Sequence, residues 1–91
     1  MDPQASSQDR TLHERARLQW QCRRGMLELD AMLQDFMDKR YDDLTPAELQ
    51  AFEMLLKAPD QLLLDYLMGH AIPIDTEVAN VAQQIRYAAG P

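Results

Sequence analysis

Cys22-Arg23-Arg24-Gly25-Met26-Leu27-Glu28 is the stretch around which the rest of the chain is organised. It separates an arginine-rich segment from the first clearly amphipathic segment, and Gly25 is the only glycine before residue 69. Glycine is the default residue where the backbone turns left-handed or approaches another surface closely. The stretch therefore predicts a tight bend between two helices, with two arginines before it and a carboxylate after it.

The segment before the bend predicts a helix that starts at Thr11 and ends near Arg23 or Arg24. Thr11 and the glutamate three residues later have the spacing of a capping box. Leu12, Ala16 and Trp20 recur every four residues, which predicts a buried stripe with Trp20 as a core anchor. A partly exposed contact role for Trp20 is the alternative. Residues 1–10 are polar and predict a disordered N-terminal tail.

The segment after the bend predicts four further helices. The second runs from about Met26 to Arg40, and the third starts at Pro46, capped by Thr45, and ends near Lys57. The fourth opens at Pro59 and stops at Gly69, and Asp75 caps the fifth. The apolar positions of these helices recur at helical spacing: Leu29, Met32, Leu33, Phe36, Met37; Leu49, Phe52, Leu55, Leu56; Leu62, Leu63, Tyr66, Leu67; Val78, Val81, Ala82, Ile85. No strand pattern competes, so we expect an all-α, compact five-helix bundle in one domain, residues 11–88.

The charge of the chain is unevenly distributed. Its formal net charge is −6, yet residues 10–24 contain five arginines and one glutamate, a net charge of +4. Non-specific nucleic-acid binding needs a broad basic face, so this small patch argues against a nucleic-acid partner and favours a protein partner. The sequence contains no apolar stretch long enough for membrane insertion and no secretory signal, which predicts a bacterial cytoplasmic protein. A matured organellar protein whose presequence has been removed is the alternative.

The sequence contains no pattern typical of catalytic or metal sites. His13 and His70 have no ligand-spaced partners, and three glycines cannot build a phosphate loop. Cys22 is the only cysteine, and a buried inert thiol is favoured over a reactive one with a depressed pKa. We therefore expect no catalytic, metal-binding or cofactor-binding residues, and the chain is not predicted to be an enzyme.

The charged residues around Gly25 allow two interpretations. In the first, Gly25 only stops a helix, and Arg24 and Glu28 form an exposed ion pair, worth ~0.2–0.5 kcal/mol. In the second, the bend and its charges form a docking surface, because the planar guanidinium of arginine binds carboxylates well at interfaces. Neither interpretation requires chemistry at the bend itself.

The chain resembles the SdhE family of succinate dehydrogenase assembly factors. Arg24-Gly25-Met26-Leu27-Glu28 fits the R-G-x-x-E motif of that family, and the resemblance extends to Tyr41-Asp42-Asp43-Leu44 and to the segment from Leu62 to His70. It covers roughly residues 11–86. The resemblance implies a five-helix fold and a monomer that binds one partner, the flavoprotein subunit of succinate dehydrogenase and, in bacteria, also of fumarate reductase.

The resemblance also implies the function and the site residues. Members of the family promote covalent attachment of FAD, which the partner carries, and the attachment reaction is autocatalytic in that partner. Carried over residue by residue, Arg24, Gly25 and Glu28 contact the partner. Met26 is expected to add an adaptable apolar contact, and Arg17, Arg23 and Arg24 are expected to steer the encounter. A regulatory, antitoxin-like binding module is the alternative; direct contact with FAD and the choice of client are left open.

Overall fold

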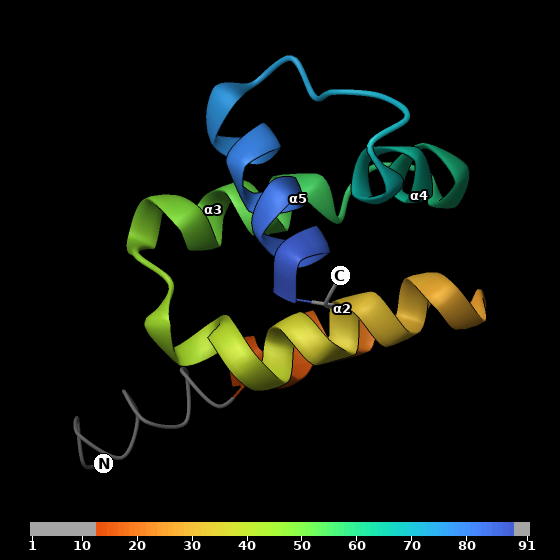
Figure 1. Cartoon of the computed structure of the whole chain (residues 1–91). Coiled ribbons are helices and arrows are strands. Elements are labelled where there is room, and N and C mark those ends of the chain that lie inside the picture. Colours follow the sequence, from red (N-terminus) through yellow and green to blue (C-terminus); the bar gives the residue numbers. More distant parts are fainter. Residues whose placement is uncertain (1–12, 89–91) are drawn as a thin grey trace, which may run out of the picture.

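The computed structural model of the chain describes residues 13–88, which form five α-helices and contain no strand (Figure 1). The first helix is described over residues 13–21. It is followed by α2 (Leu27–Arg40), the short 3-10 helix η1 (Tyr41–Asp43), α3 (Pro46–Leu55), α4 (Asp60–Met68) and α5 (Thr76–Ala88). The predicted all-α five-helix fold is confirmed. The predicted tail over residues 1–10 and the predicted cap at Thr11 lie outside the described residues.

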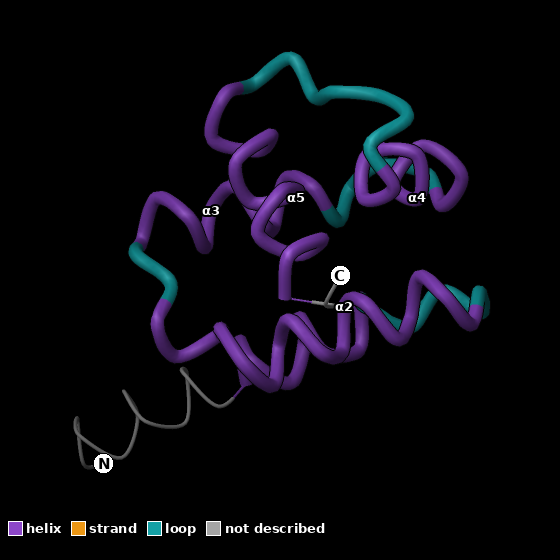
Figure 2. Tube along the Cα trace, in the orientation of Figure 1, coloured by secondary structure: helices purple, strands orange, loops and turns teal. Residues whose placement is uncertain are grey.

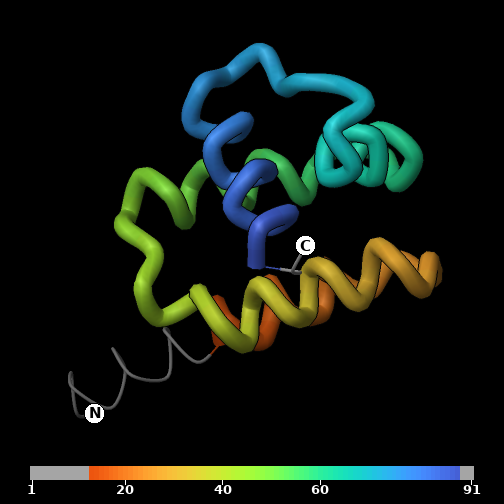
Figure 3. Tube along the Cα trace, viewed as in Figure 1, coloured from red at the N-terminus to blue at the C-terminus, as the bar shows by residue number. Residues whose placement is uncertain are grey.

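The first helix and α2 form an antiparallel pair, because the chain reverses direction at the bend around Gly25 (Figures 1 and 3). A hydrogen bond from Gln34 Nε2 to the carbonyl of Gln19, 3.3 Å long, joins the two helices. Helix α5 lies at the centre of the remaining elements and packs on α2, α3 and α4. The α4–α5 loop crosses the top of the molecule, on the far side from α2 (Figure 2).

Local capping interactions set the helix ends after the bend. Thr45 and Glu48 form the predicted capping box at the start of α3. Gly69 ends α4 with a left-handed φ of 80°, and Asp75 Oδ1 accepts hydrogen bonds from the backbone amides of Glu77 and Val78. These ends agree with the sequence prediction because each depends on residues within a few positions of one another.

The core consists of side chains from all five helices. Every predicted apolar position of α5 is buried, as are four of the five predicted positions of α2. The fully buried large side chains include Leu18, Leu29, Leu33, Phe36, Met37, Phe52, Leu55, Leu63, Leu67, Val81 and Ile85. The rings of Phe36 and Phe52 pack at a centroid distance of 5.3 Å and join α2 to α3.

The predicted stripe of the first helix is wrong at Ala16 and Trp20, and its third member, Leu12, lies outside the described residues. Leu18 and Cys22 are fully buried, whereas Ala16 is exposed and Trp20 is 70% exposed. Residues two positions apart on a helix lie on nearly opposite sides, so burying Leu18 and Cys22 turns Trp20 to solvent. The helix also ends at residue 21, slightly before the predicted position. In α4, Leu62 was expected in the core but is 38% exposed, while Leu63 and Leu67 are buried.

Candidate partner-binding site

The bend at Gly25 is an exposed, left-handed turn held by an acidic side chain of α2. Gly25 has a φ of 80°, and a Cβ atom built on it would meet no atom within 4 Å. The carboxylate of Asp30 accepts the backbone amide of Arg24 on Oδ1 at 2.7 Å and that of Gly25 on Oδ2 at 3.2 Å. One carboxylate thus fixes both amides of the bend and leaves the Cα of Gly25 facing open space.

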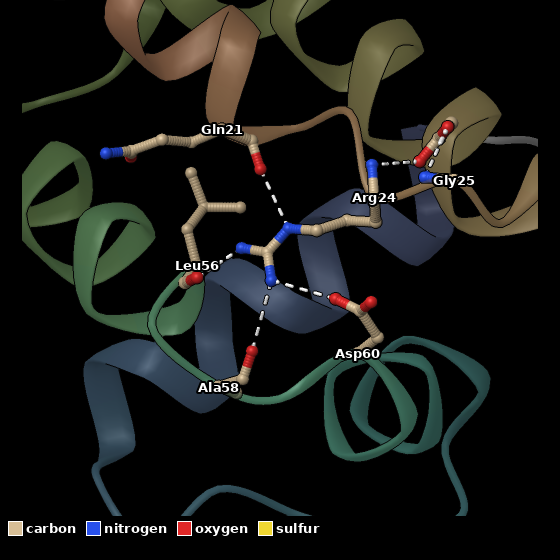
Figure 4. A network of polar contacts seen from close by, with 7 residues as sticks. Gln21, Arg24, Gly25, Leu56, Ala58 and Asp60 are labelled. Atoms are coloured by element: carbon tan, nitrogen blue, oxygen red, sulfur yellow. Dashed lines mark hydrogen bonds and ion pairs between the residues drawn. The ribbon is translucent and has the colours of Figure 1, made fainter.

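Arg24 points inward, toward the turn between α3 and α4, rather than toward solvent (Figure 4). Its Nη1 donates to the carbonyl of Ala58 at 3.2 Å and to Asp60 Oδ1 at 3.1 Å. Its Nη2 donates to the carbonyl of Leu56, and its Nε to that of Gln21 at 2.7 Å. The side chain is 15% exposed. The guanidinium therefore joins the end of the first helix to the start of α4.

The possible ion pair between Arg24 and Glu28 is absent from the described structure. Arg24 is paired with Asp60 instead, and Glu28 is exposed in the first turn of α2. The i, i+4 geometry requires a continuous helix, and the left-handed bend at Gly25 interrupts it. From Gly25 into the first turn of α2, the exposed residues are Gly25, Leu27 and Glu28, with Leu27 87% exposed.

The other predicted site residues lie close to the bend but differ in their surroundings. Met26 is partly buried and packs on the core. Arg17 is exposed and pairs with Glu53 of α3, Nη2 to Oε1 at 3.1 Å. Arg23 is exposed, and its guanidinium carbon lies 5.6 Å from the centre of the Trp20 ring. Arg17, Arg23 and Arg24 line the same surface groove.

Cys22 is buried directly before the bend. Desolvation of the thiolate is the largest effect on its pKa, and it outweighs the opposing effect of the nearby Arg24 charge. Burial thereby raises the pKa of the Cys22 thiol to about 12. The expectation of an inert thiol agrees with this environment, and the reactive alternative with a depressed pKa is contradicted.

Within residues 13–88, no group of three or more His, Cys, Asp or Glu side chains could hold a metal ion. Over the same range, no helix combines the length and the apolar composition needed to cross a bilayer. The polar contacts at the bend instead bind the chain to itself and shape a surface.

Sequence reasoning missed three residues of this site. Asp30 holds the bend, Asp60 pairs with Arg24, and Lys57 lines the groove with the arginines. Asp30 could have been found, because a carboxylate in the first turn of a helix commonly accepts nearby backbone amides. Asp60 and Lys57 lie more than thirty positions from the bend, and no local pattern relates them to it.

Comparisons with known proteins cover this whole region. Residues 16–89 match the family model described as flavinator of succinate dehydrogenase. The FAD assembly factor SdhE of Shewanella oneidensis is 43% identical over 76 residues, 84% of this chain and 93% of the relative. The FAD assembly factors SdhE of Coxiella burnetii and of Legionella pneumophila strain Paris are 41% and 47% identical over 70 and 73 residues.

Those two matches cover 77% and 80% of this chain, and 85% and 91% of the relatives. All of these alignments extend over most of both chains, and the family match contains the bend, its Asp30 support and the groove. The resemblance inferred from Arg24-Gly25-Met26-Leu27-Glu28 is thereby confirmed. The chain belongs to the family of FAD assembly factors that are described as flavinators of succinate dehydrogenase.

Proposed function

We propose that this chain binds the flavoprotein subunit of succinate dehydrogenase and promotes the covalent attachment of FAD to that subunit. The observation that carries the proposal is the family match over residues 16–89, to a family described as flavinator of succinate dehydrogenase. The relatives are named FAD assembly factors, which does not support the alternative of an antitoxin-like regulatory module. The chain acts as an assembly factor, and the flavin bond forms within the partner.

The geometry of the bend supports Gly25, Leu27 and Glu28 as the residues that contact the partner. All three are exposed, and the space beside Gly25 is open, so another backbone can approach closely there. Met26 is partly buried between this surface and the core, where its flexible side chain can adapt to an apolar contact. Arg24 contributes by holding the bend against α4, because its donors are already bound within the chain.

The exposed arginines support an electrostatic contribution to the encounter. Arg17 and Arg23 lie beside the bend in a chain whose net charge is −6. Rising salt screens such charges over a Debye length of ~8–10 Å and should slow association with the flavoprotein. An association rate that is independent of salt would count against steering by these arginines.

We also propose that the flavoprotein subunit of fumarate reductase is a second client. The FAD belongs to the partner, and this chain supplies no cofactor-binding residue. The factor works as a monomer in the bacterial cytoplasm. Size-exclusion chromatography of the chain with and without the flavoprotein subunit tests the monomer and the one-to-one complex directly.

The test of the function is covalent flavin on the client. The flavoprotein subunit is expressed without the factor, with the wild-type chain, and with the variants Arg24→Ala, Gly25→Arg and Glu28→Ala. Flavin fluorescence of the denatured client band reports the covalent bond. We expect the wild type to raise the signal, and Gly25→Arg and Glu28→Ala to abolish most of that rise. An unchanged signal with and without the wild-type chain would refute the proposed function.

A matched control separates the site from general effects of charge removal. Glu77 is an exposed acid in the first turn of α5, as Glu28 is in the first turn of α2. Glu77→Ala should therefore support normal flavin attachment. Circular dichroism of each variant establishes that the helical fold is retained, so that a lost signal reports lost docking.

A further inference from the structure

A groove of about 520 Å³ lies beside the bend, and the motif residues account for only part of it. It runs between the first helix and the turn after α3, and its lining includes Arg17, Trp20, Arg23, Glu53 and Lys57. Arg24 lines it as well, so the groove is continuous with the site proposed above. The inference that follows rests on the proposed function and concerns the part of the partner that this groove accepts.

Trp20 is the most unusual lining residue. It is the only tryptophan of the chain and it is 70% exposed, although tryptophan is a costly side chain to leave in water. A second hollow of about 230 Å³, lined by Ala16, Gln19, Trp20, Arg23 and Gln34, borders the same side chain. Trp20 thus lines two neighbouring hollows and is exposed, as is expected of an aromatic residue that contacts a partner.

The charge of the groove is positive. Arg17 is paired with Glu53 across it, but Arg23 and Lys57 have no carboxylate within ion-pair distance among residues 13–88. Both are exposed, and Arg23 stacks near the Trp20 ring, which leaves its donors free for a second group. Two uncompensated cations beside an indole fit a ligand that combines a carboxylate with an apolar side chain.

The position of the groove argues against a nucleotide as its occupant. Phosphate sites commonly use the free amides of a helix N-terminus or a glycine-rich loop. This groove lies instead where the first helix and α3 end, and helix C-termini present carbonyls rather than amides. A protein segment suits such a place, because its carboxylates can pair with the exposed cations of Arg23 and Lys57 while an apolar side chain contacts Trp20.

We infer that an acidic segment of the flavoprotein subunit, carrying at least one apolar side chain, lies in this groove against Trp20, Arg23 and Lys57. One partner can contact both the groove and the bend, because Arg24 lines the groove and its backbone amide belongs to the bend. The groove then contributes to affinity and fixes the position of the factor on the flavoprotein, while Gly25 approaches the flavoprotein.

Fluorotryptophan provides a direct readout of the groove, because Trp20 is the only tryptophan. The factor is labelled with fluorotryptophan and its fluorine NMR signal is followed during titration with the unlabelled flavoprotein subunit. We expect the signal to shift with the flavoprotein and to stay unchanged with FAD alone. A shift with FAD alone would overturn the acidic segment as the occupant in favour of a nucleotide.

Variants measure the contribution of the groove. Trp20→Ala, and the double variant Arg23→Glu with Lys57→Glu, should each weaken binding to the flavoprotein by about tenfold or more. Tyr87→Ala is the matched aromatic control, because Tyr87 is also 70% exposed and has Arg86 at 6.0 Å from its ring. Lys39→Glu is the matched charge control on α2. Both controls should bind as the wild type does.

The outcomes separate this inference from the proposed function. If the wild type neither binds the flavoprotein nor raises covalent flavin, the proposed function fails. If the wild type does both, but the groove variants bind normally and the fluorine signal does not move, only the groove inference fails. Weakened binding with a conserved helical spectrum, together with the fluorine shift, supports it.

Discussion

Arg24 and Asp60 form an ion pair, Nη1 to Oδ1 at 3.1 Å, that joins the bend to the first residue of α4. The same guanidinium binds the carbonyls of Leu56 and Ala58, which no longer have helical partners at the end of α3. The family motif therefore contains residues with two different tasks. Arg24 is bound within the chain and holds the bend, whereas Gly25 and Glu28 are exposed, and we propose that these two contact the flavoprotein.

Removal of the Arg24 side chain should destabilise the domain. Arg24→Ala leaves partly buried carbonyls without a donor, and charge-assisted hydrogen bonds contribute ~1.5–3 kcal/mol, so we expect a loss of about 2–3 kcal/mol. Arg24→Lys should recover only part of it, because an ammonium cannot reproduce the planar fork of a guanidinium. Urea unfolding followed by circular dichroism measures the difference.

Asp60→Asn is the control for the ion pair alone. It keeps the carbonyl acceptors of Leu56 and Ala58, and Asp60 is 46% exposed, so its loss should stay within about 1 kcal/mol. An Arg24→Ala protein with wild-type stability would contradict the positioning role of the guanidinium. That result would instead favour Arg24 as a residue that contacts the partner.

Arg24 also illustrates what sequence reasoning can and cannot reach here. Caps such as Thr45 with Glu48 are local, so their residues could be found from spacing alone. The acceptors of Arg24 on α4 and in the preceding turn are 32 to 36 positions away, and their proximity arises only from tertiary packing. Glu28 is nearer to Arg24 in sequence, but the bend interrupts the helical geometry that would let Arg24 and Glu28 form an ion pair.

The prediction of the buried face of the first helix was wrong for a related reason. Its sequence offers two i, i+4 pairs on nearly opposite faces, Ala16 with Trp20 and Leu18 with Cys22. Periodicity fits both pairs equally, so spacing alone cannot decide which pair is buried. Packing against α2 buries Leu18 and Cys22, while Arg23 lies near the exposed Trp20 ring.

Asp30 should be as important to the bend as the motif residues themselves. Asp30→Ala removes the acceptor of two backbone amides and should cost about 1–2 kcal/mol. Asp30→Asn keeps one acceptor oxygen and should fall between the alanine variant and the wild type, both in stability and in covalent flavin on the client. Urea unfolding and the flavin assay measure the two quantities.

Asp35→Ala is the matched control for Asp30 on the same helix. Asp35 pairs with Lys39 at 3.0 Å on the exposed face, where such pairs contribute about 0.3–0.5 kcal/mol. It should leave flavin attachment unchanged. Equal effects of Asp30→Ala and Asp35→Ala would show that the amide contacts of Asp30 do not hold the bend.

Two glycines allow backbone strain to be separated from docking. Gly25 and Gly69 both have a φ of 80°, so an alanine at either position should cost about 1–2 kcal/mol through left-handed strain. At Gly69 the added Cβ would meet the guanidinium of Arg86, the end of a flexible side chain that can move aside, whereas the space at Gly25 is open. Gly25→Ala should nevertheless reduce affinity for the flavoprotein more. The reverse order of affinities would place the docking surface elsewhere.

Cys22 should resist thiol reagents in the folded protein. The thiolate is the reacting form, and with a pKa of about 12 only about one thiol in 10⁵ is ionised near neutral pH. The side chain is also fully buried, so reaction requires an opening of the bend or of the whole domain. We expect slow labelling by a chromogenic disulfide in buffer and rapid, stoichiometric labelling in urea. Rapid labelling in buffer would show that the segment around the bend opens readily.

The Glu48 carboxylate should make stability depend on pH in the acid range. The backbone amide of Thr45 donates to it at 2.9 Å and Gln84 Nε2 at 2.7 Å, and these hydrogen bonds lower its pKa below the usual 4.5. A lowered pKa in the folded state contributes stability above 4.5, and that stability is lost as pH falls through the folded-state value.

Glu48→Gln should therefore unfold at a lower urea concentration than the wild type at neutral pH, and the gap should close as the solution becomes more acidic than pH 4.5. Glu77→Gln is the control, because the Glu77 side chain has no hydrogen-bond partner among residues 13–88. If the difference in unfolding midpoint between Glu48→Gln and the wild type stays constant across the acid range, the charge of Glu48 does not contribute to the stability of the cap. A gap that closes identifies the ionised carboxylate as the group that links α3 to α5.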